Sequence, residues 1–205
     1  MRFRLTKRDL FDTLDVWDSN LKQKVFVAAC GGTALTIYGH KESTKDVDFL
    51  VPDPSHFKTL VAMLKKLGYT QATGNGYRHP DEPWIFDLFR GQTIFTTDLL
   101  DPVNSPGKHR LIKTYSQLTL ACINPDDLVI SKVFRGTMVD EEDSLLMIQS
   151  EKLDLEQLVA RYIDTAGYNI QPLKCKVNLT NFVNFIGARG YSTVNLKGMI
   201  EEWNP

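Results

Sequence analysis

Cysteine, histidine and long apolar runs are scarce in this chain. The three cysteines, Cys30, Cys122 and Cys175, are odd in number, lie far apart and form no Cys-x-x-Cys pair. This pattern predicts reduced, structural thiols and argues against a disulfide framework or a thiolate metal site. The four histidines also lack the spacing of metal ligands, so we expect surface or capping roles for all of them.

No apolar run approaches the roughly 18 residues that a membrane-spanning helix needs, so we expect no membrane segment. The basic N-terminus leads into Asp9-Leu10-Phe11-Asp12 and not into an apolar stretch, so we expect no signal peptide. The net charge of −1 argues against a protein that coats nucleic acid, although a local basic pocket could still hold an RNA end. Together these absences predict a cytoplasmic globular protein without a membrane partner.

The first part of the chain has the periodicities of a mixed α/β (α+β) fold. Apolar spacing predicts helices over 7–22, over 33–38 with Gly39 as the residue that closes it, and over 55–67 with Ser55 as its cap. Short, strongly apolar runs predict buried strands over 25–29, 46–51 and 83–89, and further strands over 111–114 and 117–123. We therefore assign residues 1–123 to a mixed-sheet core.

The period changes at Asn124-Pro125-Asp126-Asp127, a segment that combines a helix cap, a proline in the first turn and acids for the helix dipole. Beyond it the chain is helical, with a helix capped by Asp154 and two more around 179–188 and 194–203. Residues 124–205 contain too few apolar side chains to fold alone. We expect this C-terminal helical extension to pack on the core.

Two carboxylates, Asp46 and Asp48, lie two residues apart in the predicted strand 46–51. Alternate residues of a strand point to the same face, so both side chains can reach one cation. The alternative is the polar, solvent-facing side of an edge strand. The apolar strand and the glycine pair that precede them favour metal binding.

Gly31 and Gly32 stand where the strand 25–29 turns into the next helix. Their missing side chains allow a phosphate to approach, and the N-terminus of a helix favours an anion. The alternative is a tight turn that binds nothing. Thr33 comes next, and its hydroxyl can either cap the helix or contact the phosphate.

Asp87 lies inside an otherwise apolar strand, where a carboxylate is costly unless it is paired, protonated or metal-bound. On a strand beside 46–51 it would complete a triad of carboxylates around two cations. The alternative is a structural ion pair with Arg78 or Arg90.

Lys132 and Arg135 lie three residues apart on the helix after Asn124, so they share one face and could contact phosphate oxygens. The alternative is a solvated basic stripe. Asp140 and Asp143 form a similar pair, and most such pairs cap or solvate the following helix.

These motifs resemble the polymerase-β-type nucleotidyltransferase superfamily, whose signature is an apolar strand, a glycine pair, an Asp-x-Asp strand and a carboxylate on a later strand. Within it the chain is most similar to the small bacterial group that includes the abortive-infection (AbiEii-like) toxins. The motifs shared with that group are Gly31–Leu35, Thr44–Asp48, Pro125–Leu128 with Lys132, and Asp140–Asp143. Two positions depart from the group, because Lys41 replaces an arginine and Val139 replaces a basic residue.

The resemblance implies a nucleotidyltransferase core and magnesium-dependent transfer of a nucleotide from a nucleoside triphosphate to a hydroxyl group. It implies two Mg²⁺ ions, with Mn²⁺ as the alternative metal, held by Asp46, Asp48 and Asp87. It also implies nucleotide binding by Gly31, Gly32, Thr33, Thr44, Lys132 and Arg135.

The acceptor implied by the resemblance is an RNA end such as that of tRNA, a protein or a small molecule. A role in a toxin–antitoxin pair, with a cognate partner protein, is also implied. The alternative is a catalytically silent module of the same fold that binds a nucleotide or a partner and acts in regulation.

Overall fold

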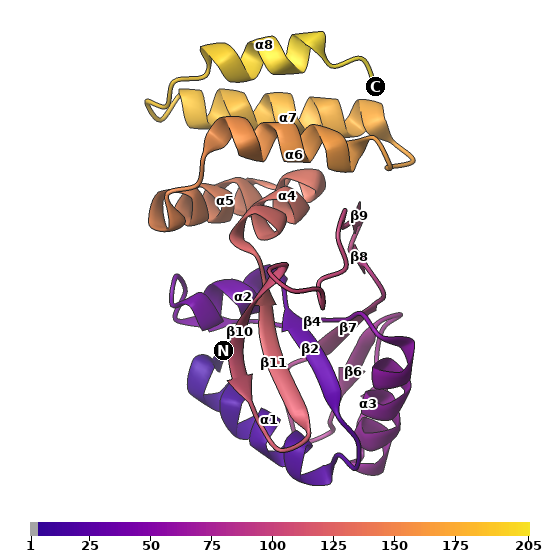
Figure 1. Cartoon of the computed structure of the whole chain (residues 1–205). Coiled ribbons are helices and arrows are strands. Elements are labelled where there is room, and N and C mark those ends of the chain that lie inside the picture. Colours follow the sequence, from indigo (N-terminus) through magenta and orange to yellow (C-terminus); the bar gives the residue numbers. More distant parts are fainter. Residues whose placement is uncertain (1–3) are drawn as a thin grey trace. The chain divides into compact units, whose positions relative to one another are not determined.

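The computed structural model describes residues 4–205, which fold into two compact units coloured along the chain in Figure 1. The sheet unit comprises the described residues up to Thr93 together with Asp101–Asn124, and the helical unit comprises Ile94–Leu100 together with Pro125–Pro205. Ile94–Leu100 lies inside the core that the sequence predicts, yet it groups with the helices. Packing of the helical part on the core stays a prediction.

The sheet unit is built on a seven-stranded mixed sheet of order β10-β11-β2-β4-β7-β6-β5. Two neighbouring pairs are parallel, β11 with β2 and β4 with β7, and the other pairs are antiparallel. The elements of this unit are β1 (Leu5–Thr6), α1 (Lys7–Asn20), β2 (Val25–Ala29), α2 (Gly31–Tyr38), β3 (Ser43–Thr44), β4 (Val47–Val51), α3 (Pro54–Lys66), β5 (Thr70–Gln71), β6 (Gly76–Arg78), β7 (Phe86–Arg90), β10 (His109–Thr114) and β11 (Leu118–Ile123).

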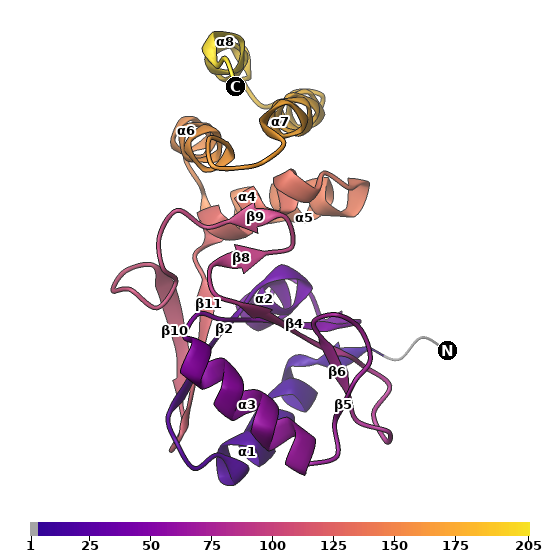
Figure 2. The ribbon, with the colours of Figure 1, turned by 90° about the vertical axis from the view of Figure 1, so that its right-hand side faces the viewer.

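Helices cover both faces of the sheet, which explains why every residue of β4 is buried. Figure 2 shows α1 and α3 on one side of β2 and β4, and α2 on the other. Trp17 of α1 is fully buried and packs its ring against Phe49 of β4 and Phe86 of β7, with ring centroids 6.2 and 4.8 Å away. Because side chains alternate along a strand, Asp48 faces α2.

The helical unit contains a short hairpin and five helices. Its elements are β8 (Thr93–Ile94), whose first residue belongs to the sheet unit, β9 (Thr97–Asp98), α4 (Pro125–Arg135), α5 (Met138–Glu151), α6 (Leu155–Ala166), α7 (Pro172–Gly187) and α8 (Val194–Glu202). Tyr162 packs on Phe134 with ring centroids 4.5 Å apart and donates a 2.9 Å hydrogen bond to the Cys175 carbonyl oxygen. None of the helices within residues 4–205 has the length and hydropathy to cross a bilayer.

Several expected boundaries shift for identifiable reasons. The second helix begins at Gly31 and not at 33, because a glycine with φ +54° can start it directly after β2. The cap of α3 is Asp53 and not Ser55, since the Asp53 carboxylate accepts the N–H groups of Ser55 and His56 at 2.6 and 3.2 Å. The helix expected around 179–188 begins earlier, at Pro172.

The three cysteines are buried thiols that form no disulfide within the described residues. Burial raises the pKa of the Cys122 thiol to about 12. The thiolate, which is the reactive form, is therefore scarce at neutral pH, in agreement with a structural role.

Candidate active site

The start of α2 lies directly against the Asp48 carboxylate. Gly31 has a φ of +54°, and a Cβ atom at this position would lie 2.3 Å from Oδ2 of Asp48. Only glycine meets both conditions without strain. The backbone N–H of Cys30 donates a 3.0 Å hydrogen bond to the Asp48 carbonyl oxygen, which joins the turn to β4. The turn thus places a helix N-terminus beside a buried acid.

The amino end of α2 presents backbone donors. Its N-cap residue, Cys30, makes no side-chain hydrogen bond to the helix, and Ala34 N–H donates to the Cys30 carbonyl oxygen at 3.0 Å. The Ala34 bond is the first one within the helix, so the N–H groups of Gly31, Gly32 and Thr33 have no acceptor within the helix. Such an end, with its positive dipole, is suited to a phosphate.

Two buried hydroxyl groups hold the Asp46–Asp48 segment in place. Thr33 Oγ1 accepts the Asp48 N–H at 2.8 Å and donates to the Asp46 carbonyl oxygen at 3.3 Å. Thr44 Oγ1 donates to the same carbonyl oxygen at 2.8 Å. These bonds explain the threonines in the sequence motif, because both hydroxyls fix the backbone that carries the carboxylates. Gly32 belongs to the same cluster, since a Cβ there would lie 2.9 Å from Thr44 Oγ1.

The sheet register aligns the carboxylates. Asp48 of β4 pairs with Asp87 of β7 in the parallel ladder, so both side chains emerge from the same face. Asp46 is exposed and lies just before β4. Burial and the nearby negative charge of Asp46 raise the pKa of Asp87, against a hydrogen bond with Thr73 that lowers it. The structure therefore brings Asp46 close enough to Asp87 for the two charges to interact.

The acidic side chains of this site are suited to binding a hard cation such as Mg²⁺. Within residues 4–205 neither Arg78 nor Arg90 forms an ion pair with Asp87, so the structural alternative for this acid is wrong. The three side chains that could bind a metal here, Asp46, Asp48 and Asp87, all offer carboxylate oxygens, the ligands that Mg²⁺ prefers. Across the same described residues, no three His, Cys, Asp or Glu side chains already converge as metal ligands. A cation would have to draw Asp46, Asp48 and Asp87 closer together.

We expect the replacement of Gly31 by alanine to reduce stability more than the replacement of Gly39 by alanine. Both glycines have positive φ, so each variant carries backbone strain of about 1–2 kcal/mol. A Cβ at Gly39 meets no atom within 4 Å, whereas at Gly31 it displaces the Asp48 carboxylate. Urea unfolding of both variants measures the difference. Equal losses would show that Gly31 does not pack against Asp48 in solution.

Lys132 and Arg135 are held by acids within the helical unit. Lys132 is only 2% exposed, and its Nζ lies 2.8 Å from Asp143 Oδ2 and 3.5 Å from Asp140 Oδ1. Arg135 donates to both carboxylate oxygens of Asp140, through Nε at 2.7 Å and through Nη2. The alternative of a solvated stripe is therefore wrong for Lys132. Binding of phosphate by either cation would compete with these ion pairs.

Asp140 and Asp143 are buried, so of the two expected roles, capping or solvating the next helix, solvation is excluded and capping is confirmed for Asp140. Asp140 also completes the capping box of α5, because its carboxylate accepts hydrogen bonds from the Thr137 N–H and hydroxyl groups. Burial works to raise the pKa of Asp140, but the hydrogen bonds and charges of its neighbours outweigh burial and lower it. Local spacing does not reveal the contact of Lys132 with Asp143, since Gly136, with φ +67°, separates α4 from α5 between them.

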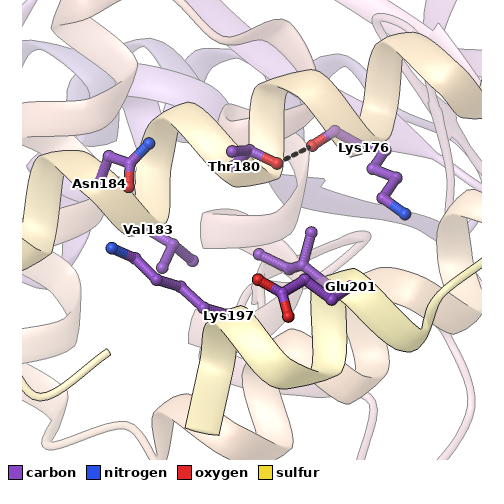
Figure 3. A pocket seen from close by; sticks show the side chains of 7 residues that line it. Lys176, Thr180, Val183, Asn184, Lys197 and Glu201 are labelled. Carbon is purple, nitrogen blue, oxygen red and sulfur yellow. Dashed lines mark hydrogen bonds between the residues drawn. The ribbon is translucent and has the colours of Figure 1, made fainter. Parts of the chain in front are cut away.

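A separate cavity of about 500 Å³ lies between α7 and α8 (Figure 3). It is lined by the apolar side chains of Val183 and Ile200 and by polar side chains from both helices: Lys176, Thr180, Asn184, Lys197 and Glu201. No residue that the sequence singled out lines this cavity.

Comparison with known proteins supports the fold. No family model and no curated protein matches the chain. Among solved structures, ANT(2″)-Ia in complex with adenylyl-2″-tobramycin is similar, with 13% identity, a TM-score of 0.53, and coverage of 77% of this chain and 95% of that one. The solution structure of the antibiotic-resistance factor ANT(2″)-Ia gives 12% identity, a TM-score of 0.51, and coverage of 76% and 88%.

The chain has the polymerase-β-type nucleotidyltransferase fold. This result confirms the α/β class that the sequence predicts, and the fold agrees with the one that the resemblance implies. At these identities the likeness concerns the fold alone, so the roles of individual residues depend on the geometry described above.

Proposed function

We propose that this protein is a magnesium-dependent nucleotidyltransferase that moves a nucleotide from a nucleoside triphosphate to a hydroxyl group. The observation that carries the proposal is the contact between the Gly31 turn and the Asp48 carboxylate, with Asp87 in register on the next strand. This contact puts phosphate-binding N–H groups and metal-binding oxygens side by side. The fold shared with ANT(2″)-Ia supports the same reaction class.

Each group has a distinct task in this reaction. The N–H groups of Gly31 and Gly32 bind phosphate oxygens. Asp46 and Asp48 would hold a cation that neutralises the phosphate charge. Asp87 would help to hold a second cation, and its carboxylate takes the proton of the attacking hydroxyl group. Bound divalent cations neutralise the charge that develops on the phosphates and activate the hydroxyl.

The nucleotide passes directly to the acceptor, without a covalent intermediate on the protein. The acceptor oxygen forms a bond to the α-phosphorus, and the bond from this phosphorus to the α–β bridging oxygen breaks. Pyrophosphate leaves with the electron pair, and the hydroxyl proton passes to Asp87. Such a transfer depends on positioning and charge neutralisation, so a Ser-His-Asp arrangement is not required.

Two classes of acceptor have support. The likeness to the structure with adenylyl-2″-tobramycin supports a small hydroxyl compound. The sequence resemblance to the AbiEii-like group supports an RNA end or a protein as acceptor, together with a cognate antitoxin. The competing proposal is a module that binds a nucleotide without transfer, and the absence of a ready-made three-ligand metal cluster within residues 4–205 favours it.

Calorimetric titration with each of the four nucleoside triphosphates, with and without Mg²⁺, tests this proposal. We expect one triphosphate to bind only when Mg²⁺ is present, because the three carboxylates otherwise repel the phosphates. Incubation with the α-labelled form of that triphosphate and RNA, protein or small hydroxyl compounds should then label one acceptor class. Tight binding without transfer to any acceptor would favour the silent module.

A further inference from the structure

The loop between β5 and β6 is attached to the strand that carries Asp87. Gly76, the first residue of β6, pairs with Asp87 in the antiparallel ladder. The Leu88 N–H donates a 2.9 Å hydrogen bond to the Asn75 carbonyl oxygen, which fixes the end of the loop to β7. Asp87 therefore has Asp48 on one side in the sheet and Gly76 on the other.

Thr73 and Asp87 share the space that the missing side chain of Gly76 leaves. A Cβ atom at Gly76 would lie 2.3 Å from Thr73 Oγ1 and 2.9 Å from Asp87 Oδ1. The Gly76 N–H donates to Thr73 Oγ1 at 2.9 Å, which uses an acceptor site of this hydroxyl and leaves its hydrogen for another acceptor. The Asp87 carboxylate is placed to be that acceptor, because its Oδ1 borders the same open space at Gly76.

We propose that Thr73 is a positioning residue for Asp87 and that Gly76 provides the space for this contact. The proposal rests on the proposed function, because it assigns Asp87 to the metal site. A hydroxyl donor on the Gly76 side holds Oδ1 there and leaves Oδ2 for a cation or for the acceptor hydroxyl. Removal of the donor frees the carboxylate to rotate, and groups that orient metal ligands typically change metal affinity about 10- to 100-fold.

The test compares Thr73→Val, which keeps the shape of the side chain and removes the hydroxyl, with Thr73→Ser, which keeps the hydroxyl. Thr70→Val is a matched control on the neighbouring β5. Crystal structures report the orientation of the Asp87 carboxylate, and electron paramagnetic resonance reports Mn²⁺ binding with a non-hydrolysable triphosphate analogue. Melting temperatures check that the fold is unchanged, which we expect because Thr73 is exposed.

In Thr73→Val we expect a rotated Asp87 carboxylate and one Mn²⁺ site weakened at least about tenfold, with wild-type behaviour in Thr73→Ser and Thr70→Val. An Asp87 carboxylate that keeps its wild-type orientation in Thr73→Val, or an unchanged Mn²⁺ affinity, would overturn the proposal. Failure of the proposed function looks different, because the wild-type protein itself would then bind no Mn²⁺ with the analogue. In that case the orientation of Asp87 in the crystal structures alone decides the role of Thr73.

Discussion

Replacement of Asp48 by asparagine should abolish nucleotide transfer while leaving the fold intact. Asparagine has the same shape, and the backbone bonds of Asp48 to Cys30 and Thr33 do not involve its side chain. The lost negative charge removes a ligand that contributes several kcal/mol through the bound cation, and each 1.4 kcal/mol or so is a factor of ten in rate. We expect the rate to fall on the order of 10³-fold, measured with labelled triphosphate.

Asp81→Asn is the matched control for this experiment. The Asp81 side chain belongs to the same unit but is 90% exposed, and its Oδ2 lies 3.7 Å from Nδ1 of the His79 ring. The Asp81→Asn protein should transfer the nucleotide at the wild-type rate. Full magnesium-dependent transfer by the Asp48→Asn protein, with its melting temperature preserved, would remove Asp48 from the metal site.

The second large effect concerns stability. Lys132→Met should lower the free energy of unfolding by about 3–5 kcal/mol, the usual cost of removing one partner from a buried ion pair. The reason is that Asp140 and Asp143, 0% and 5% exposed, would keep their charges without the ammonium between them. A lysine of a solvated basic stripe, the alternative that the sequence left open, would spare stability when removed. The burial of Lys132 reverses that expectation, and urea unfolding measures the change.

Lys174→Met provides the comparison, because Lys174 is exposed on α7 of the same unit and should change stability by less than about 0.5 kcal/mol. A double-mutant cycle of Lys132→Met with Asp143→Asn isolates the pairwise energy between the two side chains, since the second change removes the Asp143 charge. A Lys132→Met protein as stable as the wild type would show that the ion pairs do not form in solution and would leave Lys132 available to phosphate.

The sequence was most informative where one physical signal acted alone. The short, continuously apolar run 25–29 predicted a buried strand, and the structure places β2 at those residues, beside β4. The Pro125 start of α4 followed from capping chemistry in the same way. Asp87 was singled out from the sequence because an acid inside an apolar strand is costly unless it is paired, protonated or metal-bound. The parallel register of β4 and β7 places it opposite Asp48.

The contacts that the sequence did not reveal depend on tertiary placement. Helical spacing rules reach three or four residues along one helix, so they cannot connect Lys132 of α4 with Asp143 of α5 across the Gly136 turn. The same holds for Thr73, whose contact with Asp87 requires the pairing of β6 with β7 and the open space at Gly76. The packing of α4 with α5 and the pairing of β6 with β7 decide which polar side chains meet. Neither can be read from a short stretch of sequence.

A crystal structure of the wild-type protein with Mg²⁺ and a non-hydrolysable triphosphate analogue tests the central claim most directly. Our account predicts phosphate oxygens within hydrogen-bond distance of the Gly31 and Gly32 N–H groups, and Mg²⁺ coordinated by oxygens of Asp46, Asp48 and Asp87 at about 2.1 Å. A triphosphate bound elsewhere, or bound at the Gly31 turn with no metal contact to Asp48, would contradict it.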